Sequence, residues 1–477
     1  MLVYINKVDH SKTRLTNEHL LLLRMIYQLG YVNRNQLNLL WSIVKRKTVE
    51  YSQNGLVKFK RKGGLLTENK YQAKDKQNSS KKLARSVFTC STAAVNLLMD
   101  ARYLSADAQP TMRAINLHNE LTIQSFIGGL WCAAFIGPNM SDQQIAWLYS
   151  QPKLSPFSSR LSRTQEPPVQ VPPQYQSSFE PAKYDFSSFV SQQGVNRQLA
   201  TKLPFIADLM CSWQQSVTSG PAIKHESYIE FDNLTERAVV TLNKLYNYII
   251  YASDHPDTVI TLHIVCRDRS IFGNLYKREN AHDTLRHERY VLNVMEHYTQ
   301  YDADEERDVF ILEYYDGVPN LKIYISGIED SYLDIRNHLI MKNVTADTKA
   351  VVLDWLKQRD DKVLNKAQYH DTRLYKDAGV IQLNSDYNSL ILGEYNAIDT
   401  IESLRFMSED AQKGKSLWPC VFYQKGIGNR PLIPVFTPSF KAYGGLYRPT
   451  QPIVVVHELN GVLKYQTAEP KPQPLLL

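Results

Sequence analysis

The segment YIEFD at residues 228–232 constrains the fold more than any other part of this sequence. Apolar and acidic residues alternate in it, and a β-strand has a side-chain period of two. We therefore expect Glu230 and Asp232 on one face of a strand and the neighbouring apolar residues on the other. An amphipathic helical pattern follows, and a second apolar strand pattern (VITLHIVC) comes after it. This succession predicts a mixed α/β unit over about residues 196–280.

Three carboxylates in this unit form a candidate metal site. Glu230 and Asp232 repel each other when both are ionised, unless a cation lies between them. Asp208 follows the apolar run at residues 204–207, which predicts a neighbouring strand with this carboxylate at its end. Such oxygen ligands suit Mg²⁺ or Mn²⁺, which can activate water and stabilise the leaving oxygen of a phosphodiester. The alternative is that Glu230 and Asp232 form the solvated outer face of an edge strand.

The helix after this strand carries further candidates for the same catalytic site. Asn233 or Thr235 can cap its N-terminus, and Glu236 in the first turn suits the helix dipole. Lys244 lies on a polar face of the helix, from which its ammonium group can contact a phosphate beside the metal. The alternative is an ordinary amphipathic helix with a solvated polar face.

The positive charge of the chain is concentrated near its N-terminus. The 477 residues carry a formal net charge of +7. Residues 42–85 contain thirteen Lys or Arg and three acids, so this stretch carries +10 and the remainder sums to −3. A nucleic-acid-binding module requires such a local basic excess.

The pattern of elements around this basic stretch is typical of a winged helix. We expect helices over 16–30, 32–41 and 43–54, then strands at 56–59 and 85–89 around a Lys-rich loop, and a helix at 92–100. In a winged helix the third helix enters the major groove of DNA and the wing contacts phosphates. The alternative is a solvated basic loop on a generic helical domain. The predicted DNA contacts are Arg46, Lys47, Lys58, Lys60, Arg61, Lys62, Lys81, Lys82 and Arg85.

Changes of composition divide the chain into regions and predict a multidomain protein of mixed α/β (α+β) class. Residues 151–195 are rich in Pro, Ser and Gln, as in a linker. The expected regions are a winged-helix domain at 1–105, a helical connection at 106–150, this linker, the α/β core at 196–280, and a mixed α/β C-terminal region at 281–477.

Several classes of protein are disfavoured by features that the sequence lacks. Its five cysteines are far apart and include no Cys-x-x-Cys, which indicates reduced thiols and argues against a thiolate zinc site. The longest apolar run, residues 127–136, is about half the length of a membrane span, and no signal-peptide core is present. We expect a cytoplasmic protein without a membrane span. The Walker A motif of many ATPases is also missing, as is the paired-histidine motif of HUH relaxases.

The order of these motifs resembles the plasmid replication–relaxation proteins and the related MobC-type conjugative relaxases. Those proteins join a winged helix to a core similar to PD-(D/E)xK restriction endonucleases. The resemblance covers about residues 15–270 and implies DNA processing at a plasmid or integrative-element origin, with a divalent metal and with other relaxosome or replication proteins. It also implies that Asp208 and Glu230 are metal ligands and that His118 contacts DNA or transfers a proton. The motifs are VFTCSTAAVNLL at 87–98, HNEL at 118–121, Asp208, Glu230-x-Asp232-x-x-Thr235-Glu236 and Lys244-x-x-x-Tyr248.

One position departs from the endonuclease pattern, which has Lys two residues after the acid where this chain has Asp232. Three explanations of this departure are open. Lys244 replaces that lysine, Asp232 is an extra metal ligand, or the site has lost hydrolysis and only binds. The first hypothesis for function is therefore a metal-dependent DNA-nicking protein of a mobile element. The second is a non-catalytic DNA-binding protein that regulates replication or assembles a relaxosome, and the third is a phage or defence scaffold.

Overall fold

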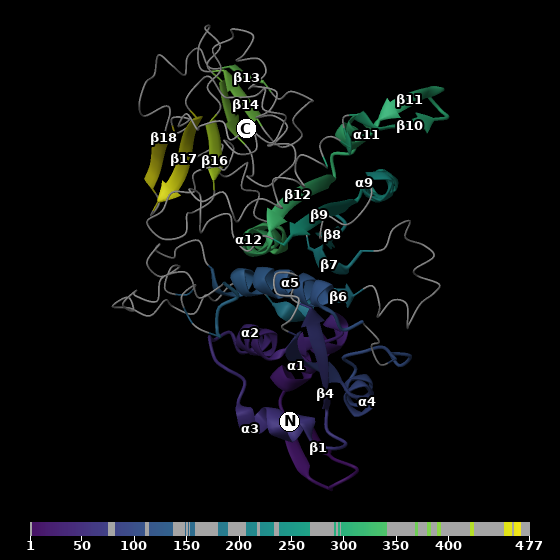
Figure 1. Cartoon of the computed structure of the whole chain (residues 1–477), viewed down its shortest axis with the longest axis vertical. Helices are drawn as coiled ribbons and strands as arrows, with labels where there is room; N and C mark the ends of the chain where they lie inside the picture. Colours follow the sequence, from purple (N-terminus) through teal and green to yellow (C-terminus); the bar gives the residue numbers. More distant parts are fainter. Residues whose placement is uncertain are drawn as a thin grey trace.

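The structure is a computed structural model of the whole chain (Figure 1). It describes residues 2–74, 82–109, 114–136, 180–188, 207–216, 220–232, 238–267 and 298–340, with short pieces elsewhere. These pieces include isolated residues between 148 and 157 and between 291 and 297, and six strands between 368 and 468. The chain folds into helices and several β-sheets, so the expected mixed α/β class is confirmed.

The N-terminal part combines short strands with four helices. Strand β5 pairs with both β3 and β4, so the three strands form one antiparallel sheet in the order β3-β5-β4. The predicted strand at 85–89 and helix at 92–100 are confirmed. The elements are β1 (Leu2–Ile5), β2 (Lys12–Leu15), α1 (Asn17–Leu29), β3 (Val32–Asn33), α2 (Arg34–Lys45), α3 (Gln53–Lys60), β4 (Leu66–Lys74), β5 (Lys82–Cys90) and α4 (Thr92–Asp100).

The expectation of a third helix at 43–54 is wrong, because the second helix continues further than expected. Asn33 caps α2 in a reciprocal capping box with Gln36, and the helix ends where Arg46 adopts a left-handed conformation (φ 52°). Helix α3 then begins after Ser52, whose hydroxyl accepts a hydrogen bond from Gly55 N. The expected strand at 56–59 is therefore part of α3. A four-residue apolar pattern fits a strand and a helix equally well, and the cap decides between them.

A five-stranded sheet forms the second part of the fold. Its strands are β6 (Asp185–Ser188), β7 (Leu209–Gln215), β8 (Ile223–Asp232), β9 (Thr258–Cys266) and β12 (Leu321–Gly327), in the order β12-β9-β8-β7-β6. Strands β8, β9 and β12 are parallel, and β7 runs antiparallel to both of its neighbours. Helix α9 (Ala238–Asp254) connects β8 to β9 and is the helix expected after YIEFD.

Helices cover both faces of this sheet. Tyr228 of β8 and Tyr248 of α9 belong to one buried cluster, whereas Ile229 and Phe231 of β8 belong to another with Tyr332 of α12. The expected division of residues 228–231 between two faces is therefore confirmed. Helices α5 (Leu117–Phe135) and α12 (Ile328–Leu339) cover the face opposite α9, and α5 lies between the sheet and the N-terminal elements (Figure 1).

The sheet takes strands from outside the range 196–280. Strand β6 comes from the segment expected to be a linker, and β12 comes from the expected C-terminal region. The remaining described elements include η1 (Pro181–Lys183), β10 (Thr299–Asp302), β11 (Arg307–Phe310), α11 (Ile311–Asp316) and, further along, β13 (Gln368–His370), β14 (Gly379–Gln382), β15 (Ser389–Leu392), β16 (Cys420–Tyr423), β17 (Ile453–Leu459) and β18 (Val462–Ala468). Within the described residues, no helix has the length and apolar character needed to cross a bilayer.

Two glycines allow α5 and α12 to pack closely. A Cβ atom added at Gly128 would collide with the Tyr332 ring, and one added at Gly129 would collide with the Ile335 side chain. Both partner side chains are buried and held by the core. The close approach of the two helices therefore depends on the missing side chains.

We expect Gly128→Ala to destabilise the fold by about 1–3 kcal/mol, since the added methyl group overpacks the helix interface. The free energy of unfolding in urea measures this effect. Gly317→Ala is the matched control, because its Cβ would lie 3.4 Å from the nearest atom, an ordinary contact distance. Equal stability of Gly128→Ala and the wild type would contradict the described packing of α5 on α12.

Candidate functional site

Asp208 immediately precedes β7 and lies beside the end of β8. Because the two strands are antiparallel and Leu209 pairs with Ile229, the start of β7 meets the end of β8. Asp208 Oδ2 accepts a hydrogen bond from Phe231 N at 2.8 Å. Asp208 stands before a strand, and residues 204–206, where the preceding strand was expected, lie outside the described residues.

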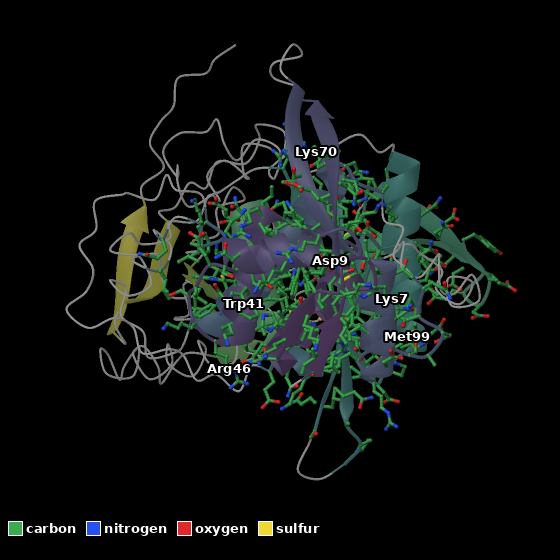
Figure 2. All side chains as sticks on the ribbon, turned by 90° about the horizontal axis from the view of Figure 1, so that it is seen from below. Lys7, Asp9, Trp41, Arg46, Lys70 and Met99 are labelled. Carbon is green, nitrogen blue, oxygen red and sulfur yellow. The ribbon has the colours of Figure 1, made fainter. Side chains whose placement is uncertain are left out.

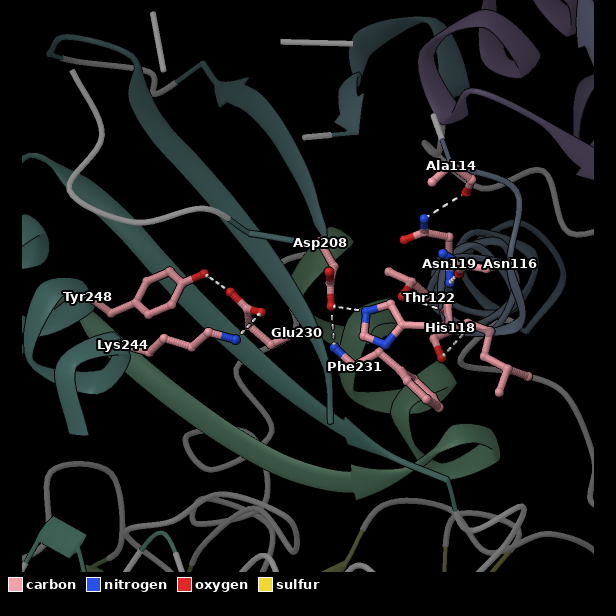
Figure 3. Close-up of polar contacts among 12 residues, drawn as sticks. Ala114, Asn116, His118, Asn119, Thr122, Asp208, Glu230, Phe231, Lys244 and Tyr248 are labelled. Carbon is pink, nitrogen blue, oxygen red and sulfur yellow. Dashed lines mark hydrogen bonds and ion pairs between the residues drawn. The ribbon is translucent and has the colours of Figure 1, made fainter. Parts of the chain in front are cut away.

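Glu230 points from the middle of the sheet toward α9 (Figure 3). The Tyr248 hydroxyl donates to Oε1 at 2.7 Å, and Lys244 Nζ donates to Oε2 at 3.4 Å. Strand β8 lies between β9 and β7, and Glu230 is 7% exposed. The alternative of a solvated edge strand is therefore wrong for this residue. The i, i+4 spacing of Lys244 and Tyr248 in the sequence already places both side chains on one face of the helix.

His118, near the start of α5, extends the site to the other side of Asp208. Its Nε2 lies 2.9 Å from Asp208 Oδ2, and its ring makes an edge contact with Phe231 at 5.4 Å between ring centroids. Asn116 caps α5 by accepting a hydrogen bond from Asn119 N, which fixes where the helix begins. Figure 3 shows Asp208 between His118 and Glu230. The structure thus brings together His118, Asp208, Glu230 and Lys244.

The two acids of this site have opposite pKa shifts. Burial raises the pKa of Glu230 to about 7, and the charge of Asp208 adds to this effect despite Lys244 and Tyr248. Burial also acts to raise the pKa of Asp208, but the hydrogen bond and charge of His118 outweigh it and keep that pKa below its ordinary value. Such separated pKa values in neighbouring carboxyl groups are characteristic of functional sites.

The three-carboxylate metal site is not formed as expected. Among the residues that the structure describes, no three His, Cys, Asp or Glu side chains are placed to hold one ion. Asp232 ends β8 and is partly exposed, and Glu236 lies outside the described residues. Asp208 and Glu230 remain as a pair of hard oxygen donors. Mg²⁺ is commonly held by one or two carboxylates together with water and substrate phosphates, so this pair fits Mg²⁺ or Mn²⁺.

Five of the nine predicted DNA contacts are exposed to solvent. Lys58 on α3 is exposed, as are Arg61 and Lys62 directly after it and Arg46 and Lys47 directly after α2. The expectation that Arg46 and Lys47 belong to the third helix is wrong, because both follow the end of α2. Lys81 lies outside the described residues, and Lys82 begins β5.

The other two basic residues are already engaged within the protein. Lys60 forms an ion pair with Glu68 at 2.5 Å and lies over the Phe88 ring. Arg85 forms an ion pair with Glu120 of α5 at 2.5 Å, and Glu120 is 4% exposed. In the sequence, Glu120 was noted only beside His118 in the HNEL motif and was assigned no role, although a carboxylate in an apolar helix was a signal.

Glu120 joins the hairpin β4–β5 to α5. Besides Arg85, its carboxylate accepts hydrogen bonds from Asn33 Nδ2 at 2.9 Å and from the Tyr71 hydroxyl of β4. Its backbone oxygen accepts a hydrogen bond from the Gln36 side chain. One buried acid thus fixes the middle of the hairpin and the start of α2 relative to the helix that carries His118.

Comparisons with known protein families, with curated proteins and with solved structures find no match for this chain. The geometry of the site is therefore the ground for any functional conclusion.

We expect Glu230→Gln to stabilise the protein at pH 8 and to have little effect at pH 5. The carboxyl pKa is raised from 4.5 to about 7 by folding, so the folded state binds an extra proton in this range and the free energy of unfolding falls as pH rises. The amide of the variant cannot ionise, so the variant keeps the free energy of unfolding that the wild type loses, which is on the order of 3 kcal/mol. Urea unfolding of both proteins at pH 5 and pH 8 measures the difference.

Glu313→Gln is the control for this experiment, because Glu313 is an exposed carboxylate in the ion pair with Arg307. It should not change the pH dependence of stability by a comparable amount. If Glu230→Gln shows the same pH dependence as the wild type, Glu230 is not the buried, raised-pKa group that the structure describes.

Proposed function

We propose that this chain is a DNA-binding protein with a metal-dependent DNA-nicking site, relaxase-like, which acts at a replication or transfer origin of a plasmid or another mobile element. The observation that carries this proposal is the meeting of Asp208, Glu230 and Lys244 at the β7–β8–α9 junction. Two acids at neighbouring strands, here Glu230 on β8 and Asp208 directly before β7, with a lysine beside them are the arrangement that a PD-(D/E)xK-like core requires. Lys244 supplies the lysine that is missing two positions after Glu230.

Asp208 and Glu230 would hold the divalent ion, which when bound would stabilise negative charge on a phosphodiester. Lys244 is about a third exposed, so its ammonium group can turn from Glu230 toward a phosphate oxygen. His118 lies on the outer side of Asp208 and is also about a third exposed. Its imidazole can hold a proton, or give one up, beside the scissile bond, with Asp208 fixing the ring orientation.

The N-terminal elements support the DNA-binding part of the proposal. Helices α1, α2 and α3 are followed by the hairpin β4–β5, with β3 as third strand, which is the element order of a winged helix. The exposed side chains of α3 are Gln53, Asn54, Val57 and Lys58, whereas Leu56 and Phe59 face the core. Amide side chains can read adenine edges and a cation can contact phosphate, so this face suits a major groove.

A second function, DNA binding without cleavage, is favoured by one specific observation. Both oxygens of Glu230 already have partners in Lys244 and Tyr248, and Asp208 is paired with His118. A site whose groups satisfy one another is stable without an ion. In this second function the acids and cations would form a structural network, and the protein would regulate replication or assemble other proteins at the origin.

We expect the wild type to nick supercoiled plasmid carrying its own origin in the presence of Mn²⁺, and not with EDTA. Glu230→Gln and Lys244→Ala should each lower the nicking rate at least about a hundredfold, because each removes a group that binds the ion or the transition-state charge. Agarose gels that separate supercoiled from open-circular DNA measure the rate. Glu313→Gln serves as the control and should nick like the wild type.

Thermal unfolding with Mn²⁺ supplies a reading that is independent of cleavage. An ion bound by Glu230 should raise the melting temperature of the wild type at pH 8 but not that of Glu230→Gln. Wild-type protein that shifts the DNA in a gel yet never nicks it with any divalent metal would refute the catalytic proposal and leave the second function.

We expect the triple variant Lys58→Gln, Arg61→Gln, Lys62→Gln to flatten the salt dependence of DNA binding. Each lost phosphate contact reduces the slope of log K against log salt concentration by about 0.9, so the change should be roughly two to three. Fluorescence anisotropy with a labelled duplex over a range of salt concentrations measures it. The control is Arg307→Gln with Lys322→Gln, on β11 and β12, which should keep the wild-type slope. An unchanged slope in the triple variant would refute a DNA-binding role for the end of α3.

A further inference from the structure

The N-terminal ribbon, β1 with β2, has an outward face made of two aliphatic and two basic side chains. Val3 pairs with Arg14 and Ile5 pairs with Lys12 across the antiparallel strands. All four side chains are exposed, and Val3 and Ile5 are 47% and 52% exposed. The opposite face carries Tyr4 and packs against the protein core. The outward face covers nothing within the described part of the chain, so packing within the protein does not account for its exposed aliphatic side chains.

The ribbon is fixed beside the end of α3. The Tyr4 hydroxyl donates to Gly63 O at 2.6 Å, and Asn6 Nδ2 donates to Lys62 O at 2.9 Å. Asn6 is 2% exposed, so the second of these bonds is shielded from water. Figure 2 views the molecule from the end that carries the ribbon, with Lys7 and Asp9 of its turn labelled. The ribbon therefore continues the surface formed by residues 58–62.

The charge of this joint surface is strongly positive. Lys7 in the turn and Lys12 and Arg14 on the outward face are all exposed. Asp9 is the one acid within residues 2–15, and it lies 4.0 Å from the Arg61 guanidinium. The surface thus places cations next to aliphatic side chains. This combination suits a polyanion whose charged groups lie beside the C–H faces of sugars and beside methyl groups.

We infer that the outward face of the β1–β2 ribbon is a second contact surface for duplex DNA, adjoining the surface at α3. Lys12 and Arg14 contact phosphates, while Val3 and Ile5 lie against sugars or thymine methyl groups. A strand of four residues is about 13 Å long, so the ribbon extends the contact by about four base pairs. A second copy of the chain fits this face less well, since self-pairing would bring Lys12 and Arg14 of both copies together. This inference rests on the proposed DNA-binding function.

Two double variants of the full chain separate the two kinds of contact, with a labelled mixed-sequence duplex of about 30 base pairs as probe. Lys12→Gln with Arg14→Gln should reduce the slope of log K against log salt by about two. Val3→Thr with Ile5→Thr should weaken binding several-fold at every salt concentration with an unchanged slope, because no counterion is displaced by an apolar contact. Threonine keeps the β-branched shape that suits a strand, so the fold is retained.

The double variant Arg307→Gln, Lys322→Gln is the matched control for loss of two charges and should bind like the wild type. If both ribbon variants keep wild-type affinity and slope while the triple variant at residues 58, 61 and 62 weakens binding, the ribbon inference is refuted and the proposed function stands. If the wild type binds no duplex at any salt concentration, the proposed function is refuted.

Two other outcomes would assign the face to a different occupant and so refute the inference. The first is a change from dimer to monomer in Val3→Thr, Ile5→Thr by analytical ultracentrifugation, with DNA affinity unchanged. The second is binding of the wild type to phosphatidylserine vesicles that Lys12→Gln, Arg14→Gln abolishes, again with DNA affinity unchanged.

Discussion

The burial of α5 on two sides is the constraint on which the rest of the structure depends. This helix packs on α2 with one side and on α12 and β8 with the other, and from Ile123 to Phe135 nearly every residue is buried. Its sequence is accordingly apolar all round instead of amphipathic, as expected for a helix in the interior. The few polar side chains that it does bury must be satisfied by hydrogen bonds. Glu120 meets this requirement through Arg85, Tyr71 and Asn33.

A consequence of this burial is that the basic hairpin and the candidate site share one rigid element. Glu120 and His118 are two residues apart on α5, yet one holds the middle of the hairpin and the other holds Asp208. A shift of the hairpin on binding DNA would act on Glu120 through a charge-assisted hydrogen bond in a buried environment, where such bonds are strong. The start of α5 therefore connects the proposed DNA-binding hairpin directly to the candidate site, without a flexible linker between them.

The sequence predicted local features of the fold well and long-range pairing poorly. The alternation in YIEFD predicted β8, both of its faces and the position of Glu230, because strand periodicity is a local property. The end of α2 depends on the left-handed conformation of Arg46, and the start of α3 depends on the cap by Ser52. The apolar pattern at 56–59 revealed neither. The sheet includes β6 and β12 because strands that are far apart in sequence can bury each other's apolar faces, which no local pattern reveals. The contact between His118 and Asp208 spans 90 residues, and no prediction from the sequence paired these two residues.

The two candidate functions differ in how the negative charge of Glu230 and Asp208 is neutralised. Two neighbouring carboxylates in a buried place raise the free energy of the doubly ionised state. Here His118 stabilises the ionised form of Asp208 and Lys244 that of both acids, yet the pKa of Glu230 remains raised. A proton on Glu230 removes the repulsion near neutral pH, and a divalent ion between the two acids would remove it more completely at higher pH. Protonation leaves Lys244 with a weaker partner, whereas an ion held by Asp208 and Glu230 would free Lys244 for the phosphate of the proposed substrate. In the proposed function, the choice between cleavage and binding alone would therefore depend on which cation, a proton or a metal ion, neutralises Glu230 at the pH at which the protein works.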